Sequence, residues 1–527
     1  MVLTIKQLLN YSWMSQASYL DFTELAQNNP TGLEAKLINS PINKGDIFTA
    51  IQAQIFTGSA TSADPTDGFS FVSYAPNYQD TGFSATVFKS NADSSFTIAV
   101  RGTEPEFSLS GDLFRADALG VVLQGAALEQ LFVGYRYYKQ LTSTGHSSYS
   151  QQELTAMASL LVTAHDKNFS NALFFVSPIA SLISSWASSL TFADRVQSMV
   201  AVIQPILSND AGLGLISANG TINFTGHSLG GHVAALLAEM VAKYGNSTIG
   251  DIATYNAPGI NALSYEIQNW FETGTATTQS GVLAKRVAIV ADAGPDVTSL
   301  LGQTNGAVQR TFIEGSPNPI DDHSIVKLSD SLAIYNLMST LDPTLNQNQA
   351  QIKTYLEEAT NEDPKSLEKT LDALRQMILG GNITPTLITG ASGTGNRDSF
   401  YTNLKLLTDS TTFQALIGQV TITAPPTTGT DARTDFSAFL SLFYLTPFSL
   451  KTNNAAANNL LLAANSALGD QWTDDYNLNS EDLQNGKANF SDQYLTDRAQ
   501  MLSWMLKVNK DDIANDNPLG YQSGTQG

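Results

Sequence analysis

The sequence predicts an α/β fold with a mostly parallel sheet, followed by a largely helical C-terminal region. Two observations in the 527-residue chain support this. Short apolar strands at 221–225 and 252–259 flank a helical segment at 229–245, and strand–helix–strand order implies a parallel pair. Further along, helical patterns dominate and are joined by loops rich in Gly, Thr and Pro. We therefore expect an α/β domain over residues 1–330 and a helical region of unassigned role over residues 331–527.

The elements of the first part can be justified in chain order. Residues 1–60 are mainly helical in pattern, and residues 83–100 alternate around the turn residues 91–94, as in a β-hairpin. Residues 126–165 carry helical periodicity. Another short apolar strand, at 286–294, extends the predicted parallel sheet.

Residues 168–193 carry no charge, and this length could span a bilayer. Pro178, several serines and the lack of positive flanks argue against a span. A buried core helix and a mobile apolar flap over a pocket are the other two interpretations. We favour the flap.

Composition excludes several classes of function. Apolar residues make up 42% of the chain and charged residues only 14%, with a net charge of −21. This balance argues against nucleic-acid partners and against anchoring on anionic lipid, since both need clusters of Lys and Arg. The absence of cysteine excludes disulfides, zinc–thiolate sites and thiol catalysis. The N-terminal segment is typical of an amphipathic helix and lacks the features of a cleavable signal peptide.

A G-x-S-x-G pattern at Gly226, Ser228 and Gly230 lies between a predicted strand and a predicted helix. That context is typical of a nucleophile elbow, in which the serine occupies a strained turn. Side chains at 226 and 230 would clash in so sharp a turn. The helix N-terminus beside Ser228 would favour a developing oxyanion. The alternative is an ordinary turn of small residues.

The general base must come from five histidines. In this arrangement the chain order is Ser, then Asp or Glu, then His, so His146 and His165 come too early. His227 adjoins the serine and should point away from it, and His232 should pack against the sheet. His323 remains, in a polar loop before an apolar run. Its alternative interpretation is an exposed loop histidine.

The acid should follow a strand between the serine and the base. Asp296 lies in the loop after residues 286–294 and is our first choice, with Asp292 second. The role of this acid would be to hold the histidine in the required tautomer and to stabilise the imidazolium. Asp321 and Asp322 adjoin the predicted base and are either solvated or ligands of a cation.

The second oxyanion donor should come from an earlier strand-to-loop junction. The strand before Gly102 ends at Val100, and the glycine lets the next backbone N–H turn into the site. We expect the N–H groups of Thr103 and Leu229 to form the oxyanion pair, with the Thr103 hydroxyl as added support. Arg101 is expected to be structural.

Five segments together resemble the class 3 lipases, which are α/β-hydrolases: AVRGTEP, GHSLGG, YNAPG, ADAGPDV and DDHSIV. The resemblance covers roughly residues 80–330, and the nearer likeness is to bacterial lipases secreted by type I export. It implies a mostly parallel sheet with apolar lid insertions. It also implies an esterase that acts on lipid carboxyl esters, with Ser228, Asp296 and His323 as the triad.

The same resemblance implies lids at about 105–125 and 168–215. It implies no cofactor for the chemistry, although the bacterial group binds calcium. The bacterial group ends in glycine/aspartate calcium repeats, which this chain lacks. The resemblance implies a bacterial, secreted protein, and the N-terminal segment indicates export without a cleavable signal peptide, although the missing repeats depart from the bacterial pattern.

The predicted function is a triacylglycerol lipase or a phospholipase A that works at a lipid–water interface and has no nucleic-acid partner. The sequence shows no basic cluster for a phosphate, which favours neutral lipid. One alternative is a lipid-targeting toxin with the same chemistry. Another is a non-catalytic module that binds hydrophobic ligands. The sequence does not indicate an oligomeric state.

Overall fold

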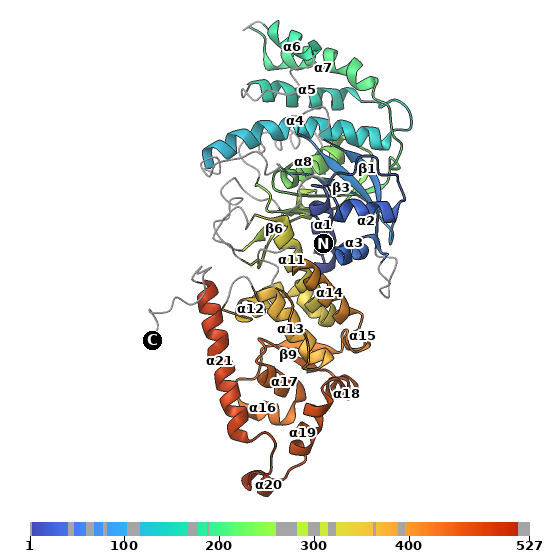
Figure 1. The fold of residues 1–527 in the computed structure, drawn as a ribbon. Coiled ribbons are helices and arrows are strands. Elements are labelled where there is room, and N and C mark those ends of the chain that lie inside the picture. Colours follow the sequence, from blue (N-terminus) through green and yellow to red (C-terminus); the bar gives the residue numbers. More distant parts are fainter. Residues whose placement is uncertain are drawn as a thin grey trace.

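The computed structural model describes residues 3–40, 47–59, 68–76, 82–102, 116–166, 177–186, 189–259, 282–292, 306–314, 323–361, 365–387 and 396–514. The molecule is elongated (Figure 1). A stack of helices lies at one end, the sheet lies in the middle, and the C-terminal helices lie at the other end. The functional candidates all come from the middle part.

A seven-stranded sheet forms the centre, and its strands lie side by side in chain order. They are β1 (Phe69–Ala75), β2 (Ala85–Ser90), β3 (Phe96–Val100), β4 (Thr221–His227), β5 (Thr248–Tyr255), β6 (Arg286–Ala291) and β7 (Ala307–Thr311), with the short helix η4 (Leu283–Lys285) before β6. The pairs β1–β2 and β2–β3 are antiparallel, and all later pairs are parallel. The predicted hairpin and the predicted parallel sheet are both confirmed.

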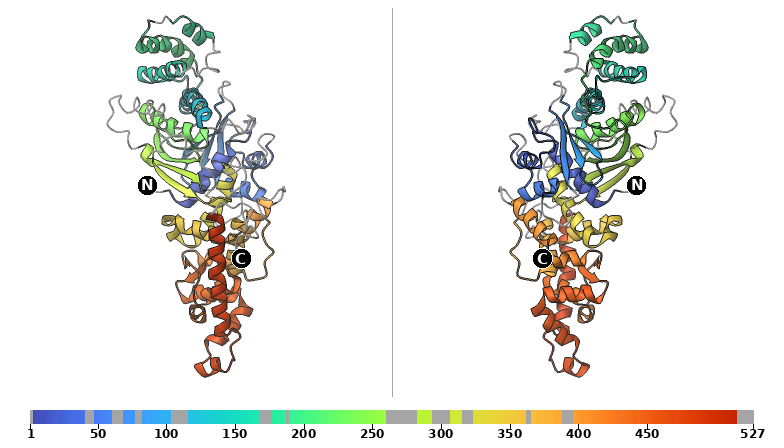
Figure 2. Two further views of the ribbon diagram at one scale, coloured as in Figure 1. Left: turned by 90° about the vertical axis from the view of Figure 1, so that its left-hand side faces the viewer. Right: turned by 90° about the vertical axis from the view of Figure 1, so that its right-hand side faces the viewer.

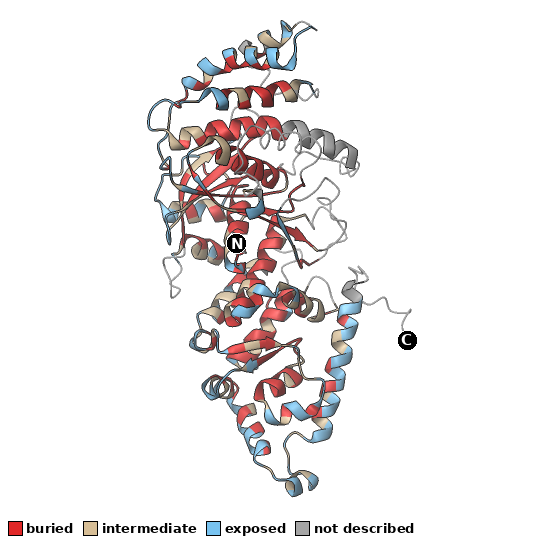
Figure 3. Cartoon of the chain, turned by 180° about the vertical axis from the view of Figure 1, so that it is seen from behind, coloured by how far each residue is buried: buried red, intermediate tan, exposed pale blue. Residues whose placement is uncertain are grey.

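Helices cover both faces of this sheet (Figure 2). One face packs against α1 (Ile5–Ala17), α2 (Pro30–Ile38), α3 (Ala50–Thr57) and α11 (Ile325–Leu341). The other face packs against α4 (Ala116–Thr142) and α8 (Leu229–Tyr244). Most of α11 is buried, because it packs against α1 and β7 and also against helices of the C-terminal region (Figure 3). The fold is a three-layer α/β-hydrolase.

Three further helices stack beyond α4: α5 (Gln151–Asp166), α6 (Ser177–Ser184) and α7 (Phe192–Ser208). The apolar side of α7 packs into the same core as α5. Much of the uncharged stretch 168–193 lies outside the described residues. Among the described residues, no helix is long and apolar enough to cross a membrane. The predicted lid at 105–125 also falls mainly outside them, although its last part belongs to α4.

The C-terminal region is largely helical, as predicted. It comprises η6 (Pro343–Gln347), α12 (Gln349–Glu358), α13 (Ser366–Leu379), α14 (Asn396–Thr408), α15 (Thr411–Leu416), β8 (Val420–Thr423), α16 (Gly429–Thr434), α17 (Phe436–Tyr444), β9 (Ser449–Thr452), α18 (Ala455–Ala464), α19 (Ser466–Tyr476), α20 (Ser480–Gln484) and α21 (Asp492–Ala514). The antiparallel pair β8–β9 was not predicted. One hydrophobic core runs from α1 through α11 into these helices. The predicted boundary after residue 330 falls inside α11.

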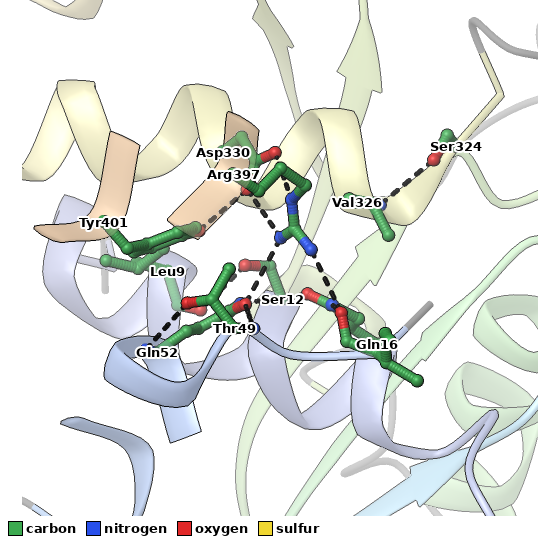
Figure 4. Close-up of polar contacts among 11 residues, drawn as sticks. Leu9, Ser12, Gln16, Thr49, Gln52, Ser324, Val326, Asp330, Arg397 and Tyr401 are labelled. Carbon is green, nitrogen blue, oxygen red and sulfur yellow. Dashed lines mark hydrogen bonds and ion pairs between the residues drawn. The ribbon is translucent and has the colours of Figure 1, made fainter. Parts of the chain in front are cut away.

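A buried ion pair joins the two parts at this boundary (Figure 4). Arg397 of α14 donates to both carboxylate oxygens of Asp330 in α11, each at 2.8 Å. The same guanidinium donates to the Ile47 carbonyl at 3.0 Å and to Gln52 of α3 at 3.2 Å. The Tyr401 hydroxyl also donates to Asp330, at 2.8 Å. A single side chain from the helical region therefore ties together α11, α3 and the segment before α3.

Candidate active site

Ser228 lies at the turn between β4 and α8, with φ 56° and ψ −135°. Such a backbone conformation in a non-glycine residue costs about 1–3 kcal/mol and must be held by its surroundings. The Ser228 N–H donates to the Tyr255 carbonyl at the end of β5, at 2.9 Å, and its carbonyl accepts from the Gly231 N–H at 3.0 Å. The predicted strand, strained turn and helix are therefore confirmed.

The glycines on either side of the serine are required by close backbone packing. A Cβ on Gly226 would lie 2.5 Å from the carbonyl carbon of Gly230, and a Cβ on Gly230 would lie 2.3 Å from the Val100 carbonyl oxygen. Backbone atoms cannot move aside as side-chain ends can. The predicted clash is confirmed, and the absence of side chains lets α8 start directly against the end of β3.

The end of β3 passes beside the serine. A Cβ on Gly102 would lie 3.2 Å from the Ser228 Cβ and 2.6 Å from the His227 carbonyl oxygen. Leu229 is the first residue of α8, where unpaired N–H groups and the helix dipole favour negative charge. Thr103, the other predicted oxyanion donor, lies outside the described residues.

His323 lies immediately before α11, whose first turn is capped by Ser324 through a bond from the Val326 N–H, at 3.2 Å. The His323 carbonyl accepts from His227 Nε2 at 2.6 Å and from Asn256 Nδ2 at 3.3 Å. The rings of His227 and His323 lie 4.7 Å apart between centroids. The structure thus brings His323 next to the residue that precedes the serine.

The other two histidines near the serine are buried. Burial, with His323 close by, lowers the pKa of His227 well below its usual value. Burial, with the Arg286 charge as a smaller cause, lowers the pKa of His232 to about 4. Both imidazoles are therefore neutral at pH 7. His146 and His165 lie elsewhere, in a bridge with Ala211 and at the end of α5.

Asp296, the first choice for the acid, lies outside the described residues. Asp292, the second choice, follows β6, and its carboxylate forms ion pairs with Lys353 of α12 and, at 3.5 Å, with Arg310 of β7. Burial lowers the pKa of Lys353, but the interactions with Asp292 and Glu357 together outweigh burial, and the net pKa is raised. The Asp292 carboxylate thus already serves an ion-pair network between the sheet and the C-terminal region.

The described residues contain no candidate for the calcium site that the resemblance implies. Within them, no group of three or more His, Asp or Glu side chains could hold a metal ion. Asp321 and Asp322 lie outside this part of the chain.

Two residues that contact the site were not predicted from the sequence. The Tyr19 hydroxyl lies 2.8 Å from His227 Nδ1. Asn256, with φ 43°, accepts from the Ala291 N–H at 2.8 Å through its side-chain oxygen and donates to His323 through its amide nitrogen. Asn256 lies inside the YNAPG segment, so its signal was present in the sequence. Tyr19 carries no local signal, because its partner is distant in the chain.

A serine in a strained strand-to-helix turn, at the carboxyl edge of a mostly parallel sheet, matches the geometry of the nucleophile elbow of α/β-hydrolases. The family model "Lipase (class 3)" matches residues 161–297, the segment that contains β4, α8, β5 and β6. The predicted resemblance is confirmed across this segment. This part of the chain, about a quarter of its length, is similar to the class 3 lipases.

Solved structures of lipases give weak structural likenesses. The Lip2 lipase from Yarrowia lipolytica is 13% identical with a TM-score of 0.25, and the match covers 58% of this chain and 78% of that one. M37 lipase is also 13% identical, with a TM-score of 0.28 and coverage of 65% and 95%. No curated protein matches the chain by sequence. The fold is defined by the seven-stranded, mostly parallel sheet and by the helices on its two faces.

Proposed function

We propose that the chain hydrolyses lipid carboxyl esters through an acyl-enzyme on Ser228. His323 takes the proton of the serine hydroxyl as the oxygen attacks the ester carbonyl, and then gives it to the leaving alcohol. Water activated by the same histidine hydrolyses the acyl-enzyme. Asp296 holds the histidine tautomer. The Leu229 N–H and the Thr103 N–H stabilise the oxyanion.

One observation carries this proposal: Ser228 is held in a strained conformation at the N-terminus of α8, beside the segment that carries His323. Strain of this kind persists only where the surroundings fix it, and it clusters at functional sites. An ordinary turn of small residues has no need of it. The elbow also lies inside the segment that matches the lipase family.

We further propose neutral lipid, such as triacylglycerol, as the preferred substrate at a lipid–water interface. A net charge of −21 disfavours anionic headgroups. Exposed apolar side chains lie just before and at the start of α7, where Leu190 is 37% and Phe192 is 44% exposed. They belong to the predicted lid at 168–215, and they support a role for that segment in contact with lipid.

The test compares the wild type with Ser228→Ala on short- and long-chain nitrophenyl esters, a triacylglycerol emulsion and a phosphatidylcholine emulsion. We expect the variant to lose on the order of 10³-fold or more of the rate. Ser480→Ala, an exposed serine of α20, is the matched control and should keep full activity. Faster hydrolysis of triacylglycerol than of phosphatidylcholine supports the neutral-lipid preference.

Equal activity of wild type and Ser228→Ala would overturn the proposal. If every protein were inert on every ester, with and without calcium, a module that binds hydrophobic ligands would replace it. A lipid-targeting toxin would share the chemistry and would be separated by its effect on target membranes.

A further inference from the structure

We propose that Tyr19 and His227 form a hydrogen-bonded chain that positions the backbone of His323, and that this chain sets how well the base reaches Ser228. The inference rests on the proposed function. It assigns a role to the histidine of the GHSLGG segment and to a tyrosine from the N-terminal segment.

The direction of the chain follows from the chemistry of its atoms. The His323 carbonyl can only accept, so His227 Nε2, at 2.6 Å, must carry a proton. Because burial keeps this imidazole neutral, its other nitrogen carries none. Nδ1 therefore accepts from the Tyr19 hydroxyl, at 2.8 Å. The chain runs from the Tyr19 O–H through the imidazole of His227 to the carbonyl of His323.

The start of the chain is firmly fixed. Tyr19 follows α1 and is 4% exposed. A Cβ on Gly102 would lie 2.3 Å from its hydroxyl oxygen, so the hydroxyl is wedged against the end of β3. The rings of Tyr19 and His227 are also in contact, with centroids 5.8 Å apart. The tyrosine hydroxyl can therefore set the rotation of the imidazole.

The end of the chain is held from a second side. Asn256 donates to the same His323 carbonyl at 3.3 Å, and its own side-chain oxygen is fixed by the Ala291 N–H of β6. The last residue of β4 and the residue that follows the adjacent parallel strand β5 thus supply both donors to one carbonyl. This fixes the start of α11 relative to the edge of the sheet where Ser228 lies.

The same bonds exclude His227 as the catalytic base. Both of its ring nitrogens are engaged, one by Tyr19 and the other by His323. It is a positioning residue, which acts through His323. Such positioning matters because a displacement of about 1 Å in a reacting group can cost about 10²-fold in rate.

The experiment measures kcat and KM on a soluble nitrophenyl ester for His227→Leu, His227→Gln and Tyr19→Phe. Gln keeps an N–H near the position of the imidazole Nε2, whereas Leu removes it. We expect kcat to fall about 10- to 100-fold in His227→Leu, with KM within about twofold of the wild type. His227→Gln should recover most of that loss. Tyr19→Phe should lower kcat about 3- to 10-fold.

Tyr137→Phe is the matched control for Tyr19→Phe. The Tyr137 hydroxyl also makes a short bond, to Ser73 at 2.7 Å, but it joins α4 to β1. The Tyr137→Phe variant should leave kcat unchanged. The melting temperature is recorded for each variant, so that a loss of fold is separated from a loss of rate.

Unchanged kcat in His227→Leu, or equal losses in the Leu and Gln variants, would overturn the inference. If the Leu variant does not fold, Tyr19→Phe decides: lower kcat than Tyr137→Phe supports the chain, and equal kcat overturns it. Ser228→Ala is measured in parallel. Activity retained there would refute the proposed function itself, whereas an inactive Ser228→Ala beside fully active chain variants refutes only this inference.

Discussion

At the scale of single residues, a buried histidine links the stability of the protein to pH. His232 is 5% exposed, and its pKa in the folded protein is about 4, mainly because of burial. In the unfolded chain its pKa returns to the ordinary 6.5, so the unfolded state takes up a proton first as the pH falls. The stabilising effect of this group is thus complete above about pH 6.5 and is lost as the pH falls toward 4.

We expect His232→Gln to flatten the dependence of the unfolding free energy on pH between about 6.5 and 4. The full effect of the shift corresponds to roughly 3 kcal/mol. Urea denaturation at several pH values measures it for the wild type and the variant. His146→Gln, at an exposed histidine, is the control. Parallel curves for wild type and His232→Gln would contradict the prediction.

At the scale of elements, α8 can pack closely against β3 only because residue 230 is a glycine and has no side chain. We expect Gly230→Ala to destabilise the protein by about 3 kcal/mol, because the new Cβ would lie 2.3 Å from the Val100 carbonyl oxygen. The midpoint of chemical denaturation measures this loss. Gly145→Ala is the matched control, since a Cβ there has no atom within 4 Å, and its effect should stay within about 0.5 kcal/mol. A Gly230→Ala protein as stable as the control would show that the contact can relax.

The elements that the sequence predicted are those with strong local patterns. The hairpin β2–β3, the unit β4–α8–β5 and the strand β6 all have apolar runs bounded by turns. The edge strand β7 was missed because its residues are largely exposed and do not form an apolar run. β8 and β9 were missed because each has only four residues. Their pairing depends on contacts between distant segments.

The residues of the predicted site divide in the same way, into those with a local sequence pattern and those whose contacts come from distant segments. Ser228 could be located because glycine spacing and the strand–helix context are local. His323 was reached by elimination, and the structure places it beside the elbow. The ion pairs of Asp292 could not be predicted from the sequence, because its partners Lys353 and Arg310 come from other elements. Asp296 and Thr103 stay predictions.

At the scale of the whole molecule, the buried pair of Asp330 and Arg397 joins the hydrolase core to the helical region. Asp330 is only 5% exposed at its side chain. Arg397→Met would leave its carboxylate buried without its main partner, which costs about 3–5 kcal/mol. We expect a lower unfolding midpoint and faster proteolysis of the C-terminal helices.

Two controls define this effect. Lys487→Gln removes an exposed ion pair with Asp482 and should leave the midpoint unchanged. The double variant with Asp330→Asn should recover part of the loss, because the unpaired charge is gone. If Arg397→Met were as stable as Lys487→Gln, the pair would not be what joins the two parts.

The position of α1 has a consequence for the order in which the protein matures during synthesis. α1 packs against the sheet and α11, and Tyr19 just after it reaches His227, whose other partner is His323. A ribosome releases the N-terminal segment first and the segment from His323 onward much later. α1 therefore leaves the ribosome before the later strands of the sheet and α11, against which it packs, have been synthesised. Contacts of such long sequence separation form late in folding. The hydrolytic activity that we propose would thus arise only after α11 has left the ribosome.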